Sequence, residues 1–241
     1  MLKGLAEENC MTRIYEDGTY LGNNPLWHED DSPWKVKQIR KIIEKNSLTP
    51  KKICEIGCGA GEILNLLSEQ YGKDVELFGY EISQQAFDLC KKKAKKNLTF
   101  YLSDLLTNSD SFFDIVLAID VFEHVEDYFG FLRKLKNKAK FKIFHIPLDL
   151  SVQTVLRSSP IIRGRRLVGH LHYFSKETAL ETLKDIGYEI VDYMYTGGSL
   201  ELPKRGWKSN LLKIPRKIAF KINNDLAVRI LGGYSLLVLT K

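Results

Sequence analysis

The chain of 241 residues contains little cysteine and no long apolar run. Four cysteines, Cys10, Cys54, Cys58 and Cys90, show no paired metal-binding spacing, so we expect reduced thiols and neither a zinc module nor a disulfide framework. No stretch approaches the ~18 apolar residues of a membrane span, and charges occur throughout the N-terminal region, where a signal peptide would be apolar. The sequence therefore predicts a cytoplasmic protein.

An excess of basic over acidic residues is absent outside one segment. The formal net charge is +6, yet residues 204–229 alone hold eight lysines and arginines against one acid, Asp225. Such a segment indicates a local contact surface and argues against a nucleic-acid-binding fold, in which basic residues cover a whole face. The apolar fraction of 44% is ordinary and sufficient for one α/β domain with additions.

The most informative stretch begins with a short apolar strand, Lys52–Ile56, that contains Glu55. Gly57, Gly59 and Gly61 follow at alternate positions, and a helical pattern begins at Glu62. A tight turn between strand and helix needs backbone without Cβ atoms. The turn leaves N–H groups at a helix N-terminus facing a ligand. This arrangement is typical of a nucleotide site at the carboxyl end of a first strand.

The spacing of these glycines differs from that of dinucleotide sites. The pattern G-x-G-x-x-G requires a third glycine where this chain has Glu62. An acid before the glycines suits a ligand with a positive amine better than one presenting a pyrophosphate. The stretch resembles the first motif of class I S-adenosylmethionine-dependent methyltransferases, E/D-x-G-x-G-x-G, and the resemblance extends over about residues 50–195. It implies S-adenosylmethionine as cofactor, with Glu55, Gly57, Gly59 and Gly61 holding its amino-acid part.

Acids also end the next strands. Glu81 lies 24 residues beyond Gly57, close to the spacing at which an acid accepts ribose hydroxyls. Ile82 would pack on the adenine. The resemblance further implies that Asp104 and Leu105 lie near the exocyclic amine of adenine, although Asp104 could equally be a turn residue. It also implies that the cofactor is lined by a later group after the fourth strand, namely Asp120, Val121 and His124.

The hydrophobic pattern predicts a Rossmann-like α/β fold, a seven-stranded and mostly parallel sheet with an antiparallel last strand and helices on both faces. We expect residues 1–48 to form an N-terminal extension with a lid helix, although Trp27 and Trp34 could simply pack that helix on the sheet. Residues 49–241 would form the methyltransferase domain, with insertions at about 147–172 and 197–232. The predicted strands are Lys52–Ile56, Val75–Glu81, Leu98–Leu102, Phe113–Ile119, Phe141–Ile146, Tyr188–Met194 and Tyr234–Leu239.

The turn Asp120–Val125, with the sequence D-V-F-E-H-V, resembles the fourth motif of small-molecule methyltransferases of the ubiquinone and menaquinone type. Methylases of exocyclic base amines usually carry an Asn/Asp-Pro-Pro-aromatic turn there, which this chain lacks. A general base assists methyl transfer to a hydroxyl, and histidine suits that role at neutral pH. His145 is the first candidate, followed by His170 and His172. We expect no metal, because no carboxylate or cysteine spacing accompanies the histidines.

Two basic regions bear on the acceptor. The arginines between Arg157 and Arg166 suggest an anionic substrate, because guanidinium groups bind phosphates and carboxylates in a bidentate manner. Residues 211–222 form an amphipathic basic pattern, which could rest on an anionic inner membrane surface. We expect instead that its apolar side, including Ile214 and Ile218, covers the core.

The sequence thus predicts methyl transfer to oxygen or nitrogen of a small anionic metabolite, such as a sugar or lipid-linked intermediate of surface-glycan biosynthesis. Three alternatives stay open. They are an RNA or other nucleic-acid methyltransferase that uses the basic C-terminal segment, a nicotinamide-dependent oxidoreductase, and a silent binding module on the same fold. The oligomeric state is not indicated.

Overall fold

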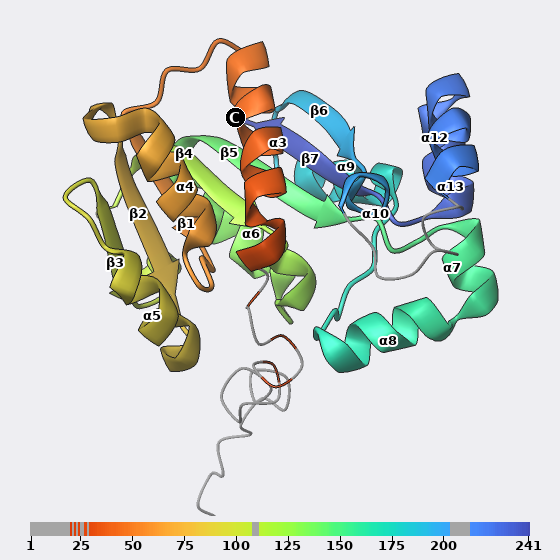
Figure 1. Cartoon of the computed structure of the whole chain (residues 1–241), viewed down its shortest axis with the longest axis horizontal. Helices are drawn as coiled ribbons and strands as arrows, with labels where there is room; N and C mark the ends of the chain where they lie inside the picture. Colours follow the sequence, from red (N-terminus) through yellow and green to blue (C-terminus); the bar gives the residue numbers. More distant parts are fainter. Residues whose placement is uncertain are drawn as a thin grey trace, which may run out of the picture.

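The computed structural model describes Tyr20, Gly22, Asn24, Trp27 and residues 29–107, 111–202 and 213–241. Within these ranges seven strands form one sheet in the order β3-β2-β1-β4-β5-β7-β6 (Figure 1). Neighbours from β3 to β5 pair in parallel, whereas β7 runs antiparallel to both β5 and β6. The strands are β1 (Lys52–Ile56), β2 (Glu76–Glu81), β3 (Leu98–Leu102), β4 (Phe113–Ile119), β5 (Ala139–Pro147), β6 (Ile190–Thr196) and β7 (Ser235–Thr240).

Helices connect the strands and cover both faces of the sheet. Most begin at a recognisable cap; Ser83, Asp127, Ser151 and Ser175 each accept a hydrogen bond from a backbone N–H in the first turn that follows. The helices are α3 (Ser32–Lys45), α4 (Glu62–Tyr71), α5 (Gln84–Cys90), α6 (Tyr128–Lys136), α7 (Val152–Arg157), α8 (Ser159–Leu167), α9 (Lys176–Asp185), α10 (Gly198–Glu201), α12 (Lys213–Ile222) and α13 (Asn224–Leu231).

Two hydrophobic cores lie on opposite faces of the sheet. One core joins α3 and α4 to the sheet through side chains such as Ile42 and Leu64. The other joins α6 and α9 to it through residues such as Leu132 and Leu183. The central strands are buried on both faces, which explains the continuous apolar run of β4. Because the strands from β1 to β5 are parallel, their carboxyl ends meet at one edge, and the segments that follow them can build a common site there.

The fold predicted from the sequence is confirmed. The boundaries of β1, β3, β4 and α4 agree with the prediction, whereas β5 begins two residues earlier and β6 lies two residues later. The expected insertions contain α7 and α8, and α10, α12 and α13, which gather to one side of the sheet (Figure 1). None of the helices in the described ranges is long and apolar enough to cross a membrane.

The expected orientation of the basic helix is wrong. The side chains of Ile214, Ile218 and Ile222 are 61%, 54% and 81% exposed. The opposite side of α12 packs inward, where the Phe220 ring stacks on Tyr234 with ring centroids 5.1 Å apart. Phe220, together with Arg216, which donates to the carbonyl oxygens of Leu231 and Gly232, holds this helix, and its row of isoleucines faces solvent beside Lys217 and Lys221. Leu211 and the basic residues 204–208 lie outside the described ranges.

Candidate active site

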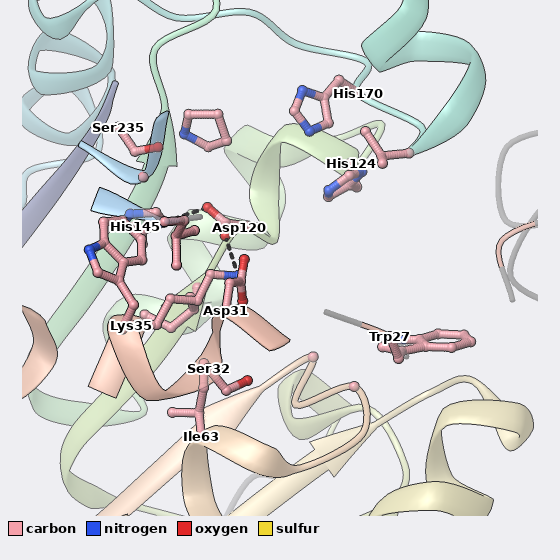
Figure 2. Close-up of a pocket in the computed structure, with 18 of the residues that line it drawn as sticks. Trp27, Asp31, Ser32, Lys35, Ile63, Asp120, His124, His145, His170 and Ser235 are labelled. Atoms are coloured by element: carbon pink, nitrogen blue, oxygen red, sulfur yellow. Dashed lines mark hydrogen bonds and ion pairs between the residues drawn. The ribbon is translucent and has the colours of Figure 1, made fainter. Parts of the chain in front are cut away.

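A cavity of about 540 Å³ opens at the carboxyl ends of the central strands. One half is walled by the glycine turn after β1 together with Trp27 and Ser32 (Figure 2). The other half is walled by the end of β5, helices α7 and α8, and the segment before β7. Asp120 and His124, which follow β4, lie between the two halves. We call these the nucleotide half and the acceptor half.

The glycine turn has a backbone that other residues adopt only with strain. Gly57, Gly59 and Gly61 have φ angles of 65°, 54° and 76°, in the left-handed region. A Cβ atom on Gly59 would lie 2.7 Å from Cδ1 of Trp27, so the indole rests directly against this turn. A Cβ on Gly61 would lie 2.7 Å from Cβ of Cys90, which explains why the helix α4 can begin so close to α5 and β3.

Two glutamates flank this turn. Glu55 is 2% exposed, lines the cavity, and has one carboxylate oxygen, Oε2, for which the described part of the chain offers no hydrogen-bond partner. Burial raises its pKa well above the ordinary value. The Glu81 carboxylate accepts hydrogen bonds from the backbone N–H groups of Gly59, Ile82 and Ser83 at 2.8, 2.9 and 2.8 Å. Burial raises the pKa of Glu81, and these three donors oppose the shift. Its carboxylate therefore points toward the glycine turn.

A charged network crosses the centre of the cavity (Figure 2). Asp120, a non-glycine residue with φ of 54°, places Oδ1 2.6 Å from Nδ1 of His145 and Oδ2 3.0 Å from Nζ of Lys35. Lys35 also lies 3.1 Å from Oδ1 of Asp31. Burial would raise the pKa of Asp120, but His145 and Lys35 hold it well below its ordinary value. Burial would lower the pKa of Lys35, yet Asp120 and Asp31 raise it. Asp120 and Lys35 are therefore both charged.

The second ring nitrogen of His145 is also bonded. Nε2 lies 2.9 Å from Oγ1 of Thr196, whose hydroxyl also donates to the backbone carbonyl of Ser235. While that proton is directed to Ser235, Oγ1 of Thr196 can only accept a hydrogen bond from Nε2–H; when the hydroxyl turns to donate to the ring, Nε2 holds a lone pair. The edge of the Trp34 indole faces the His145 ring, with ring centroids 6.0 Å apart. His145 is thus held on three sides at the boundary of the acceptor half.

A second carboxylate–histidine pair lies in the acceptor half. Nδ1 of His170 is 2.7 Å from Oδ2 of Asp149, and the His170 ring meets the His124 ring edge-on at 4.9 Å between centroids. Glu123 stands behind His124 with 1% exposure, and its pKa is raised well above the ordinary value by burial and by Asp120. Both of its carboxylate oxygens lack a hydrogen-bond partner.

Several residues expected at the site lie elsewhere. The Nε2 atom of His172 is 2.9 Å from the carbonyl oxygen of Val125, and its ring packs on Tyr128, so it holds a loop and does not line the cavity. Asp104 accepts from the Leu106 N–H as a turn residue does, and the Leu105 side chain is fully buried in the core. Neither lines the cavity, and the same is true of Glu81, Ile82 and Val121, although the Glu81 carboxylate contacts the N–H of the lining residue Gly59. Val121 instead packs against Gly57, where a Cβ would lie 3.2 Å from it.

Sequence reasoning missed three residues that line the cavity and one that lies behind it. Nothing near Lys35 in the sequence indicates a site, because a lysine on an amphipathic helix is usually solvated. The sequence shows Asp149 only as a polar residue after β5. Glu123, behind the cavity wall, belongs to the recognised D-V-F-E-H-V turn, and its burial could not be read from that turn. Tyr234 lines the acceptor half with a buried hydroxyl that has no hydrogen-bond partner among the described residues; its apolar neighbours indicated only a strand.

The arginines expected to bind an anionic substrate also lie outside the cavity. Those of α7 and α8 point to the surface, namely Arg157, Arg163, Arg165 and Arg166. The apolar side chains among them are exposed as well, including Leu156 at 81%. These helices therefore present a mixed basic and apolar surface beside the cavity.

A family described as a methyltransferase domain matches residues 26–193 of the chain. Norajmaline N-methyltransferase of Rauvolfia serpentina is 31% identical over 105 residues, which are 41% of this chain and 35% of that protein. Ubiquinone biosynthesis O-methyltransferase of Coxiella burnetii is 30% identical over 102 residues, 40% of this chain and 41% of that protein. The chain thus spans about two-fifths or less of the length of these two relatives.

The fold is shared with solved structures at lower sequence identity. The plantazolicin methyltransferase BpumL, solved with a desmethyl analogue and S-adenosylhomocysteine, superposes with a TM-score of 0.60. The match has 14% sequence identity and covers 96% of this chain and 93% of that one. At this identity the likeness concerns the fold.

Proposed function

The chain belongs to the methyltransferase-domain family, and from this premise we propose that it transfers a methyl group from S-adenosylmethionine to oxygen or nitrogen of a small acceptor. The family confirms the resemblance, the enzyme class and the methyl donor predicted from the glycine-rich motif. It disfavours the nicotinamide-dependent alternative, which is also disfavoured because Glu62 stands where the dinucleotide pattern requires its third glycine. The orphaned Glu55 oxygen beside the glycine turn is the observation that carries the proposal.

The residues present fit the methyl donor. Glu55 offers a buried, unpaired carboxylate oxygen, which suits an ammonium group and would be costly to leave unpaired. Gly57 and Gly59 line the cavity without side chains, so a ligand can approach their backbone. Glu81 would accept the ribose hydroxyls with the lone pairs that its three backbone donors do not use. Trp27 would cover this group as part of the lid expected from residues 1–48.

When bound, S-adenosylmethionine supplies an activated methyl group and a sulfide as leaving group. The protein then needs mainly to align the acceptor with that methyl group, and alignment alone can contribute about 7–11 kcal/mol. The acceptor would meet the methyl group between the two halves of the cavity, beside Asp120 and His124. Lys35 on α3 holds the Asp120 carboxylate in place. Closing the nucleotide half with Trp27 would also exclude water.

We assign the role of general base to His145. Its contact with Asp120 fixes a proton on Nδ1 and leaves the lone pair on Nε2, the tautomer that a base requires. An acceptor hydroxyl or protonated amine would take the place of Thr196 at Nε2 and transfer its proton there. His170 is the other histidine in the cavity, but its ring faces His124 and Glu123 and does not face the centre.

Tyr234 provides a specificity contact for the acceptor. Its buried hydroxyl lacks a partner in the described residues and can donate to, or accept from, a polar group of the acceptor. A site built to hydrogen-bond one group of its substrate rejects analogues without that group, because its own polar atom is then left unpaired.

The acceptor is further proposed to be anionic or lipid-linked and to arrive from an anionic membrane surface. Helices α7, α8, α12 and α13 expose apolar side chains together with basic ones, as peripheral membrane surfaces do. Thr154, Pro160 and Val168 of these segments also line the acceptor half, so the surface adjoins the cavity. The sugar part of the predicted acceptor gains no support from the cavity.

Turnover with isotopically labelled S-adenosylmethionine tests the proposal. The chain is incubated with separate water-soluble and lipid extracts, and products that acquire one labelled methyl group are identified by mass spectrometry. We expect a labelled product in the lipid extract, and none with His145→Ala. Tight binding of S-adenosylhomocysteine without any labelled product would identify a silent binding module. Labelled RNA as the sole product would identify the nucleic-acid alternative.

A further inference from the structure

Glu123, His124 and His170 converge at the wall of the acceptor half, and we propose that they bind one divalent metal ion. One ligand atom from each of the three side chains lies within 4.8 Å of the others. His124 and His170 line the cavity, whereas Glu123 is buried behind them (Figure 2 shows the two imidazoles). Two imidazoles and one carboxylate are a recurrent ligand set for catalytic metals with open coordination positions.

The state of Glu123 is the second observation. Its side chain is 1% exposed and neither carboxylate oxygen has a hydrogen-bond partner among the described residues, while Nε2 of His124 lies 3.8 Å from Oε1. A buried carboxylate in this condition is costly unless it takes up a proton or a cation compensates its charge. The lysine of the central network does not serve this purpose, since Lys35 contacts Asp31 and Asp120. A metal ion between Glu123 and the two histidines would satisfy this group.

The surroundings of His170 match those of a metal ligand. Asp149 lies 2.7 Å from Nδ1, and a carboxylate on one ring nitrogen leaves the lone pair on the other for a metal. Backbone hydrogen bonds fix the distance between His170 and the turn that carries Glu123 and His124. The backbone N–H groups of Leu171 and His172 donate to the carbonyl oxygen of Glu123 at 2.8 and 3.1 Å. His170 is therefore held against the turn that carries Glu123 and His124.

Metal binding would draw the three side chains together. Two ligands that each lie about 2.1 Å from one ion are at most about 4.2 Å apart, so the ligand atoms approach one another by side-chain rotation. The nitrogen-rich set favours a borderline ion such as Zn²⁺ or Fe²⁺ over Ca²⁺ or Mg²⁺, which prefer oxygen ligands. The proposal departs from the expectation of no metal, which depended on the apparent lack of a carboxylate near the histidines in the sequence.

A metal here would also act on the acceptor, and this part depends on the proposed function. The remaining coordination positions face the acceptor half, where an acceptor hydroxyl could bind the ion. Coordination lowers the pKa of that hydroxyl. The proton would pass to His145 or to solvent, and the oxygen would then form its bond to the methyl carbon as the carbon–sulfur bond breaks.

The test is a Co²⁺ titration of the full chain, freed of metal by a chelator and carrying no histidine tag. We expect one equivalent of Co²⁺ with visible absorption bands of a site containing nitrogen ligands. Glu123→Gln and His170→Ala should weaken binding at least 100-fold, and Asp149→Asn about 10–100-fold. The matched control is His172→Gln, which alters a neighbouring histidine outside the set and should retain full affinity.

Each outcome decides the matter. Absence of a stoichiometric Co²⁺ complex, or equal weakening in His172→Gln and His170→Ala, would overturn the proposal. Far-UV circular dichroism identifies a variant that fails to fold. If Glu123→Gln fails to fold, the affinity of His170→Ala, a substitution in a loop, is compared with that of His172→Gln instead. Binding of S-adenosylhomocysteine is measured on the same samples. Loss of that binding with Co²⁺ retained contradicts the proposed function alone, and the reverse contradicts the metal site alone.

Discussion

Oδ1 of Asp120 lies 2.6 Å from Nδ1 of His145, where β4 and β5 end side by side. The same carboxylate contacts Lys35 on α3, so one aspartate joins the N-terminal helix to two central strands. The charge of one aspartate therefore holds together α3, the end of β4 and the end of β5, which are far apart in sequence. The network both stabilises the fold and orients the His145 ring at the acceptor half.

Removing the Asp120 charge should affect stability and catalysis together. Asp120→Asn leaves Lys35 without its closer partner in a buried setting, and we expect a loss of about 2–4 kcal/mol in the free energy of unfolding. Methyl transfer should fall at least 100-fold, because His145 loses its orienting partner. Denaturant unfolding and turnover measure the two effects. As a control, Asp88→Asn removes an exposed partner of Lys91 and should alter neither quantity.

Two glycine substitutions separate the effect of backbone strain from the effect of contact between the glycine turn and a ligand. Gly59→Ala places a Cβ 2.7 Å from the Trp27 ring, whereas Gly72→Ala has open space at a similar φ of 58°. Both should lose about 1–2 kcal/mol of stability from the left-handed backbone. Calorimetry should show at least 10-fold weaker binding of S-adenosylhomocysteine for Gly59→Ala alone. Equal affinity in the two variants would mean that Gly59 does not face the ligand.

Trp27 is expected to act as a lid. Trp27→Ala should increase the dissociation rate of S-adenosylhomocysteine about 10-fold, because the indole that rests on Gly59 is lost. Stopped-flow fluorescence measures this rate. Trp34→Ala provides the comparison, since Trp34 contacts His145 and Glu201 and should change the KM for the acceptor. A Trp27→Ala variant with an unchanged rate would show that this residue only packs.

Buried acids should make the chain less stable as pH rises. Burial raises the pKa of Glu55 and Glu123 well above 4.5, so the folded state binds more protons than the unfolded state above that pH. Their contribution to stability therefore decreases as pH rises from about 4.5 through the raised values. Glu55→Gln should flatten this decrease in unfolding experiments between pH 5 and 8, as judged against Glu69→Gln on the exposed side of α4. A Glu55→Gln profile as steep as that of the unmodified chain would contradict the assignment.

The exposed isoleucines of α12 make the membrane proposal testable. Ile218→Glu together with Ile222→Glu should abolish cosedimentation with vesicles that contain anionic phospholipid, and neutral vesicles should bind weakly throughout. Val191→Glu, at an exposed position on β6, is the matched control and should retain binding. Cosedimentation that survives the double substitution would assign this surface another role.

Much of the fold was predictable because its signals are local. The strand β4 is a continuous apolar run, and the helix α4 follows directly from the glycines. The start of β6 was less predictable, since Tyr188 resembles a strand residue but donates its hydroxyl proton to the Leu132 carbonyl oxygen across the core. The side of α12 that faces inward was not predictable either, because periodicity identifies an apolar side and does not show what covers it.

The site was predictable only in its nucleotide half. The glycines and Glu55 form one contiguous motif, whereas the acceptor half is assembled from long-range contacts. His170 meets the turn of Glu123 through backbone hydrogen bonds between segments that are distant in sequence. Leu105 shows a limit of prediction from motifs. The motif alone places this residue at the cofactor, but its side chain lies in the hydrophobic core. Motifs identify where a ligand binds, and tertiary contacts determine which neighbours complete the site.

The most direct measurement is calorimetric titration of the chain with S-adenosylhomocysteine, compared with Glu55→Gln and with NAD as a second ligand. We predict binding of one equivalent, weakened about 10–100-fold in Glu55→Gln because a charge-assisted hydrogen bond is worth about 1.5–3 kcal/mol, and no heat from NAD. Binding of NAD alone, or equal affinity for S-adenosylhomocysteine in both proteins, would contradict the account.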